Sequence, residues 1–204
     1  MLDILFKGGW LMIPLVFCSA LALAIIITKL ISLRLLEARS NRFVDKTRHL
    51  IRGHEERRVD KVLAFCEMTV NLPLANILKA GIVKKDRDRR EVMEAIENAG
   101  SSEVPKVERY LKILATIVTV APLLGLLGTV MGMIRTFNVI AVQGVGEPGA
   151  LAGGIGEALI TTAVGLTIAI PSLVFYNYFM HRADKIIRKL ESASNEFMEL
   201  LLEK

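Results

Sequence analysis

The stretch GGIGEALITTAVGLTIAIPSLVFYNYF, residues 153–179, decides the fold because it is long, almost wholly uncharged and interrupted by a single acid, Glu157. A helix needs about 20 residues to cross about 30 Å of hydrocarbon. Two other charge-free windows reach that length, from Gly8 to Thr28 and from Ile113 to Ile134. A buried core helix explains one such run but not three, so the sequence predicts an all-α membrane protein with three transmembrane helices.

The composition of the 204-residue chain suits a protein divided between lipid and water. Apolar residues make up 52% and mean hydropathy is +0.46, yet charged residues still reach 23%, with a net charge of +5. Cys18 and Cys66 form no C-x-x-C pair, and His49, His54 and His181 lack metal-ligand spacing. There is neither a nucleophile elbow nor a phosphate-binding loop. The sequence therefore predicts no enzymatic activity, no metal, no cofactor and no binding of nucleic acid.

The first apolar window admits two interpretations. Lys7 before an apolar run and the small-residue match Ala20-Leu21-Ala22 are typical of a cleaved signal peptide. The run continues through LAIIIT up to Thr28, which is longer than the apolar core of most signal peptides. This length favours a retained transmembrane anchor.

Lysine and arginine are distributed unequally around the three windows, which predicts the orientation. They crowd the segment after the first span and the tail after the third, whereas Thr136 to Gly156 has none. Positive residues stay on the cytoplasmic side. The predicted order is an outward N-terminus (1–7), a first span (8–28), a cytoplasmic helical region (29–112), a second span (113–134), an outward loop (135–150), a third span (151–180) and a cytoplasmic C-terminal helix (181–204).

The segment between the first two spans reads as amphipathic helix nearly throughout. One apolar stripe with helical spacing is formed by Leu33, Leu36, Phe43, Thr47 and Leu50. We expect the last helix of the segment to run toward the second span with a bend near Gly100 and Pro105. The abundant charge indicates a solvated helix surface or, for the cations nearest the membrane, contact with anionic lipid.

Small and hydroxyl-bearing residues follow helical spacing in the second and third spans. In the second span one helix face holds Pro122, Gly125, Thr129, Gly132 and Thr136, and Gly128 and Gly132 form a G-x-x-x-G pair. In the third span one face holds Glu157, Thr161, Gly165, Ile168 and Ser172, with Thr162 on an adjoining face. Small residues let transmembrane helices approach closely, so we predict packing roles for the glycines. Pro122 and Pro171 are expected to kink their helices. For Thr129, Thr161 and Thr162, packing and the lining of a polar pathway remain equally open.

Glu157 is the residue that packing explains least. A helix that begins near Pro148 has Glu157 as its tenth residue, roughly 13 Å along the axis. An acid at the middle of a span costs on the order of 2.5–3.5 kcal/mol, so such residues usually face a protein interior or mark an ion path. The alternative is a surface glutamate on a helix that projects beyond the membrane.

Two segments together resemble the MotA/TolQ/ExbB proton-channel family, and its ExbB and TolQ branch in particular. They are PLLGLLGTVMGMIRTF, residues 122–137, and the opening stretch, residues 153–179. The resemblance covers the whole chain in order, orientation and topology. Met131 stands where ExbB and TolQ often have a bulky aromatic residue, and Arg135 and the outer loop vary, which leaves the branch undecided.

The resemblance implies an assembly as well as a fold. It implies a homopentamer in the bacterial inner membrane, with the second and third spans around a central pore and two spans extended into a cytoplasmic helical bundle. A single-span partner resembling ExbD or TolR is expected inside the pore and supplies an aspartate that carries protons, since this chain has no aspartate in any predicted span. A further partner resembles TonB or TolA.

The resemblance also implies roles for individual residues. Glu157, Thr129 and Thr162 match the family's pore residues, with Thr161 beside them, and Asn177 matches an asparagine near the cytoplasmic exit. The expected function is an ion-driven motor subunit that energises TonB- or Tol-dependent import or envelope integrity. A structural membrane scaffold, a stand-alone cation channel and a small-solute carrier remain alternatives.

Overall fold

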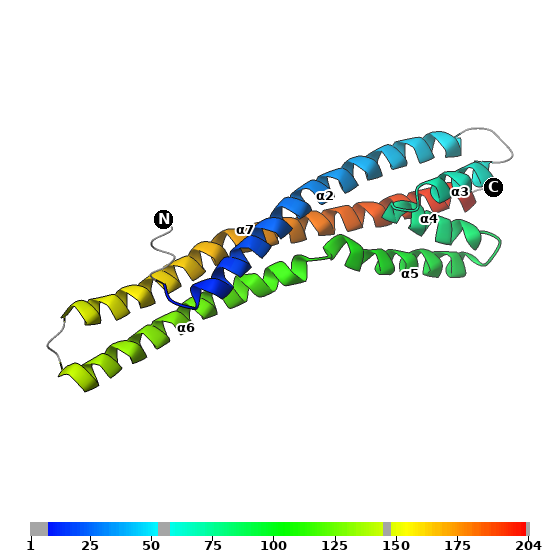
Figure 1. Cartoon of the computed structure of the whole chain (residues 1–204). Coiled ribbons are helices and arrows are strands. Elements are labelled where there is room, and N and C mark those ends of the chain that lie inside the picture. The colour runs from blue at the N-terminus through cyan, green and yellow to red at the C-terminus, as the bar shows by residue number, and fades with distance from the viewer. Residues whose placement is uncertain (1–7, 53–57, 145–147, 203–204) are drawn as a thin grey trace. The chain divides into compact units, whose positions relative to one another are not determined.

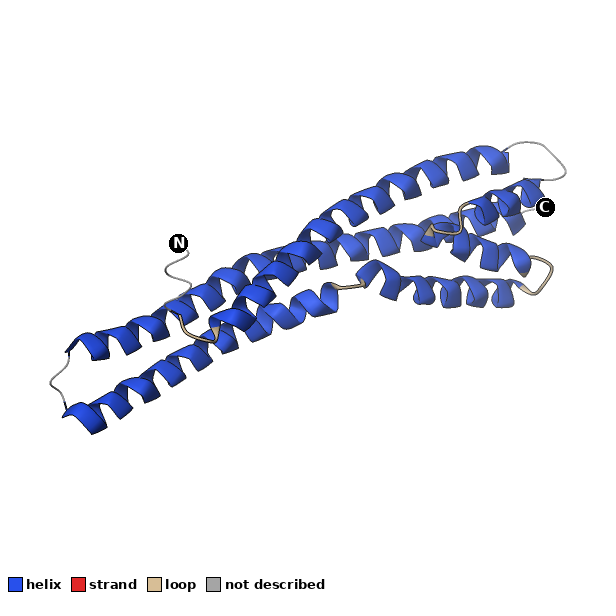
Figure 2. Ribbon diagram, in the orientation of Figure 1, coloured by secondary structure: helices blue, strands red, loops and turns tan. Residues whose placement is uncertain are grey.

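The computed structural model describes residues 8–52, 58–144 and 148–202, and over these ranges all regular secondary structure is helical (Figures 1 and 2). The helices are α2 (Met12–Arg52), α3 (Arg58–Met68), α4 (Pro73–Val83), α5 (Arg89–Glu108), α6 (Leu111–Gln143) and α7 (Pro148–Leu202). The predicted all-α class is therefore confirmed for the described part of the chain.

Three of these helices are long and apolar enough to cross a membrane. The qualifying stretches are Met12–Leu50 in α2, Leu111–Val142 in α6 and Ala152–Phe197 in α7. In α2 and α7 the helix continues from the apolar stretch into a charged one without interruption. Because a helix satisfies its backbone hydrogen bonds internally, it can continue from lipid into water with the same geometry. Pro122 and Pro171 both lie inside continuous helices.

The helices form two compact units. The first contains the chain up to Thr28 together with Tyr110–Tyr178, and so holds the apolar parts of α2, α6 and α7. The second contains Lys29–Arg109 with Phe179–Lys204, and so holds α3, α4, α5 and the charged parts of α2 and α7.

Within the first unit, α6 and α7 pack through small residues. The buried positions of α6 recur every three or four residues at Leu114, Ile117, Ala121, Gly125, Gly128, Gly132 and Thr136. Those of α7 do the same at Gly154, Ala158, Thr161, Gly165, Ala169 and Ser172. A spacing of three and four residues keeps each set on one helix face. The two faces meet along α6 and α7, which run side by side in this unit (Figure 1).

Glycine is required where the two backbones come closest. A Cβ atom on Gly165 would lie 2.6 Å from the carbonyl oxygen of Ala121, and one on Gly125 would lie 3.0 Å from the Cα of Thr162. The Thr162 hydroxyl donates a hydrogen bond of 2.8 Å to the Gly125 carbonyl, joining the helices at the same level. In lipid the hydrophobic effect contributes little to helix association, so close backbone packing and interhelical hydrogen bonds stabilise the contact between α6 and α7.

The outer surface of the first unit is the apolar one. Large side chains that are more than 40% exposed include Ile13, Phe17, Leu123, Leu126, Ile170 and Val174. In water, a surface of this kind would mark an interaction site or an aggregation hazard. With small residues inside and large apolar residues outside, the unit has the distribution that a lipid environment favours.

The second unit has a conventional apolar core. Fully buried members include Phe43, Val62, Leu74, Ile77, Leu78, Val92 and Phe197. The Phe43 and Phe65 rings stack with centroids 4.9 Å apart, and the Lys46 ammonium lies 4.5 Å from the Phe65 centroid. Burial also raises the pKa of the Cys66 thiol to about 11.

Polar contacts within the second unit tie its helices together. The buried Glu103 carboxylate accepts hydrogen bonds from Asn76 Nδ2 at 2.9 Å and from Lys106 Nζ at 2.7 Å. Arg182 of α7 pairs with Glu37 of α2 at 2.5 Å, and Arg48 donates three hydrogen bonds to the two oxygens of the Glu196 carboxylate. These pairs join the charged parts of α2 and α7.

The bend expected near Gly100 and Pro105 stays a prediction. Helix α5 runs through both residues and ends at Glu108. Helical geometry is interrupted at Arg109, which is extended (φ −46°, ψ 134°), and at Tyr110, which is left-handed (φ 71°, ψ −12°), before α6 begins at Leu111. Pro105 lies in the last turn of α5, and because proline has no N–H it cannot donate the helical hydrogen bond to the Ser101 carbonyl.

Candidate functional site

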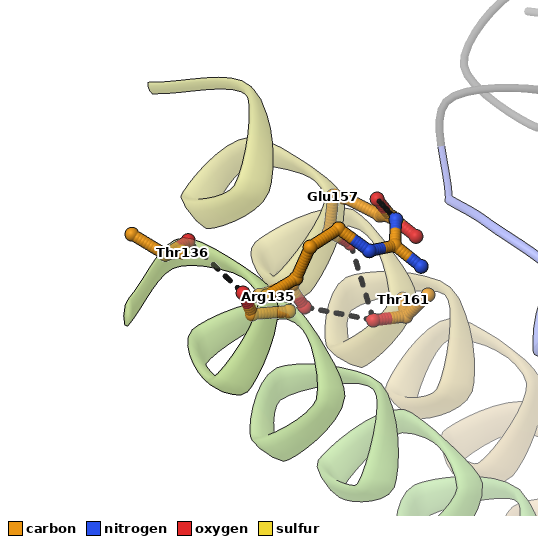
Figure 3. A network of polar contacts seen from close by, with 6 residues as sticks. Arg135, Thr136, Glu157 and Thr161 are labelled. Atoms are coloured by element: carbon orange, nitrogen blue, oxygen red, sulfur yellow. Dashed lines mark hydrogen bonds and ion pairs between the residues drawn. The ribbon is translucent and has the colours of Figure 1, made fainter. Parts of the chain in front are cut away.

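Glu157 lies in the third turn of α7 and is ion-paired with Arg135 of α6. Arg135 Nη1 donates a hydrogen bond to Glu157 Oε2 at 2.5 Å (Figure 3). The Glu157 side chain is 20% exposed and that of Arg135 is 55% exposed. The carboxylate is thus held in the angle between the two helices, while the guanidinium reaches it from the more open side.

A third element closes the site from the N-terminal side. Gly9, in the turn before α2, has a positive φ of 68°, and a Cβ atom there would collide with the Glu157 carboxylate. Gly8 is buried beside it, and a Cβ on Gly8 would press on Met12 and lie 3.4 Å from Thr161 Cγ2. Glycine is therefore needed here for two reasons, since the backbone is left-handed and the space is taken by the carboxylate.

The threonines expected at the site bond mainly to backbone. Thr161 is buried, and its hydroxyl donates to Ala158 O at 2.8 Å and Glu157 O at 3.2 Å. Thr136 is likewise buried and donates to Gly132 O at 3.0 Å (Figure 3). Thr129 is half-buried and donates to Leu126 O at 2.6 Å. Such i−3 and i−4 bonds satisfy hydroxyls in apolar surroundings.

The remaining sequence-predicted residues fall into two groups. Gly125, Gly128, Gly132 and Gly165 lie where α6 and α7 meet, and a Cβ on Gly128 would collide with the Thr161 side chain. Pro122 is half-buried, while Pro171 and Asn177 are exposed. The structure therefore brings Glu157, Thr161 and Thr162 together with the α6 glycines, and leaves Asn177 about five turns further along α7.

Arg135 and Gly9 were not predicted as site residues. Arg135 is separated from Glu157 by 22 residues, and Gly9 lies in the turn before α2, so no local spacing relates either one to the acid. The sequence does indicate Arg135 in one way. Acids within membrane spans usually pair with another polar group, and Arg135 is the basic residue nearest to Glu157 in the sequence.

The arrangement is an ion pair. Among residues 8–52, 58–144 and 148–202, no three histidine, cysteine or acidic side chains lie close enough to share a metal. Arginine stays charged under all physiological conditions. While the carboxylate is ionised, the pair therefore has no net charge, and the carboxylate is the member that can exchange a proton or release a cation.

Three apolar helices, a glycine-packed hairpin and an acid held between its arms define a multi-pass membrane protein with a polar site inside its helix bundle. Comparison with known proteins gives the family. The family model described as the MotA/TolQ/ExbB proton channel family matches residues 69–192. The chain belongs to this family.

Named relatives are similar over different lengths. The chain is 34% identical over 174 residues to putative biopolymer transport protein ExbB-like 3 of Synechocystis sp., covering 84% of this chain and 81% of the relative. It is 40% identical over 119 residues to a putative ExbB homolog of Methanothermobacter thermautotrophicus, covering 58% and 42%. It is 37% identical over 119 residues to the Tol-Pal system protein TolQ of Pseudomonas aeruginosa, covering 58% and 52%. The matches to these last two span about half of each relative.

Proposed function

We propose that the chain is the ring-forming subunit of an ion-driven motor in the cytoplasmic membrane, which energises a TonB- or Tol-type process. The observation that carries the proposal is Glu157, an acid mostly withdrawn from solvent between two apolar helices. Acids in such positions are costly and usually serve ion transfer. Membership in a proton-channel family and similarity to ExbB and TolQ proteins support the same assignment.

The proposed assembly needs several copies of this chain and a partner. A homopentamer would place α6 and α7 of each copy around a central passage, with Glu157, Thr129, Thr161 and Thr162 toward it and Asn177 near its cytoplasmic end. A single-span protein of the ExbD or TolR kind would occupy the passage and supply the aspartate that the spans of this chain lack. Work would then be delivered to a TonB- or TolA-like protein.

The energy available sets a limit on the mechanism. Each elementary charge that crosses 100 mV releases about 2.3 kcal/mol. Several charges must therefore cross for each mechanical step of useful size. A ring in which every copy presents one acid provides several equivalent transfer sites, which is the arrangement such a step requires.

A structural scaffold is the second candidate, and the Arg135–Glu157 pair favours it. If the carboxylate only bonds to its neighbours, the pair would serve to fasten α6 to α7. A neutral glutamine of nearly the same shape would then preserve function. A stand-alone channel is distinguished by conduction in vesicles that contain the chain without any partner.

The deciding experiment compares Glu157→Ala and Glu157→Gln with the wild type in cells that depend on this chain. We expect both variants to insert at normal abundance and to abolish energised uptake or envelope function. Retained function in the glutamine variant alone would support the scaffold. Full function in both variants would overturn the motor proposal.

A further inference from the structure

We propose that Arg135 and Gly9 are positioning residues for Glu157, and that they hold its carboxylate in a closed, charge-balanced site within a single subunit. The proposal rests on the proposed role of Glu157 in ion transfer. It adds that ion transfer depends on a defined carboxylate position, which is built by three segments that are distant in the sequence.

The first part of the argument concerns Arg135. Its contact with Glu157 joins one guanidinium nitrogen to one carboxylate oxygen at 2.5 Å, so Oε2 is fixed. Charge-assisted hydrogen bonds of this kind are stronger than neutral ones and strongly directional. The Arg135 side chain is 55% exposed against 20% for that of Glu157, so the pair is more accessible to solvent at the arginine than at the carboxylate.

The second part concerns Gly9. Oε1, the other carboxylate oxygen, is the Glu157 atom nearest to the place where a Cβ on Gly9 would lie. Arg135 thus contacts one oxygen and the Gly9 backbone borders the other. A carboxylate enclosed from both sides keeps one orientation, whereas an exposed glutamate side chain samples many rotamers.

The third part concerns the charge of the site. Because the pair has no net charge, a ring of such subunits would not attract cations as a ring of bare carboxylates would. Selection would depend on whether an incoming ion or acid can replace Arg135 at Oε2. Removing the cation while keeping the acid should therefore change the accessibility of the carboxylate more than it changes the fold.

The chain offers matched control variants. Gly9→Ala and Gly144→Ala both place a side chain on a backbone with positive φ, 68° at Gly9 and 72° at Gly144. Only the Gly9 variant meets the carboxylate, since a Cβ on Gly144 has nothing within 4 Å. Arg135→Gln removes the charge, whereas Arg135→Lys keeps it.

The first readout needs neither a partner nor motor activity. An apolar carbodiimide is applied to each purified variant in micelles, and labelling of Glu157 is followed by mass spectrometry. We expect slow labelling in the wild type and the Gly144→Ala variant. Labelling should be about tenfold faster in Arg135→Gln, which loses one charge-assisted hydrogen bond, and in Gly9→Ala, whose Cβ displaces the carboxylate from that bond. Arg135→Lys should stay near the wild type. Equal labelling of all variants would overturn the inference.

The second readout is ion influx into vesicles that contain the chain with its single-span partner. We expect Arg135→Gln and Gly9→Ala to reduce influx to the level of Glu157→Gln, and Arg135→Lys and Gly144→Ala to retain most of it. If Glu157→Gln stops influx while Arg135→Gln and Gly9→Ala do not, the inference fails and the proposed function stands. If Glu157→Gln keeps full influx, the proposed function fails, and carbodiimide labelling still decides the positioning. Should Arg135→Gln fail to fold, the two glycine variants decide alone.

Discussion

Replacing Gly165 by alanine tests whether α6 and α7 associate through backbone contact. The new Cβ would lie 2.6 Å from the Ala121 carbonyl oxygen and 3.2 Å from the Gly125 Cα. Both neighbours are backbone atoms, so no side chain can rotate away. Ordinary contact begins near 3.4 Å, so the helices must separate locally by about 0.8 Å.

The expected cost follows from this displacement. Overpacking of a well-packed interface costs about 1–3 kcal/mol, while exchange of glycine for alanine in a helix returns about 0.5–1 kcal/mol. The difference spans about 0–2.5 kcal/mol, and because both neighbours are backbone atoms that cannot rotate away, we expect a net loss of about 1–2 kcal/mol. For a chain of this size it corresponds to a melting temperature lower by about 2–8 °C.

The assay is thermal unfolding of the purified protein in detergent micelles, with Gly153→Ala as the control. Gly153 lies in the same helix, and a Cβ there meets nothing within 4 Å. The control should melt at the wild-type temperature or slightly above it. If Gly165→Ala melts together with Gly153→Ala, close backbone packing does not stabilise this hairpin and the reasoning is refuted.

Two further predictions concern the second unit. Asn76→Ala removes a hydrogen bond to the buried Glu103 carboxylate and should lower the free energy of unfolding, measured with denaturant, by about 2 kcal/mol. Lys79→Ala breaks an exposed ion pair with Glu67 and should lower it by less than about 0.5 kcal/mol. Equal losses in the two variants would contradict this prediction. Burial raises the pKa of Cys66 to about 11, so its thiol stays protonated at neutral pH. Maleimide should therefore leave it unmodified in the folded protein and react as the pH approaches 11 or after unfolding; rapid labelling at about pH 7 would refute its burial.

Much of the fold follows from the lengths of uncharged sequence. A run of about 20 apolar residues has few options besides a membrane helix, so three such runs indicate α2, α6 and α7 without knowledge of their contacts. Pro148 as a favourable first residue indicated where α7 begins, and α7 does begin there.

The break between α5 and α6 had no comparable signal. Gly100 and Pro105 are the usual residues at bends, yet both stay helical, and the left-handed residue is Tyr110. Tyrosine has no intrinsic preference for that conformation. Its backbone is set by the segments that it connects, and propensity alone carries no information about them.

Part of the candidate site can also be predicted from the sequence, and part of it cannot. The unusual position of Glu157 is visible in the sequence because an acid stands out in an apolar run. Its partners are not, since Arg135 and Gly9 reach it only after the hairpin and the N-terminal turn have formed. Helical spacing placed Thr129 on the packing face, whereas in the structure Gly128 meets Thr161 and Thr129 is half-buried. One residue of difference corresponds to about 100° around the helix.

The measurement that tests the central claim most directly is ion influx into vesicles that contain this chain with its single-span partner. Proton- and sodium-sensitive dyes would follow influx for the wild type and for Glu157→Gln at equal abundance. We predict influx of one of these ions in the wild type and loss of it in the variant, with the complex still intact. Equal influx in the two proteins would contradict the account.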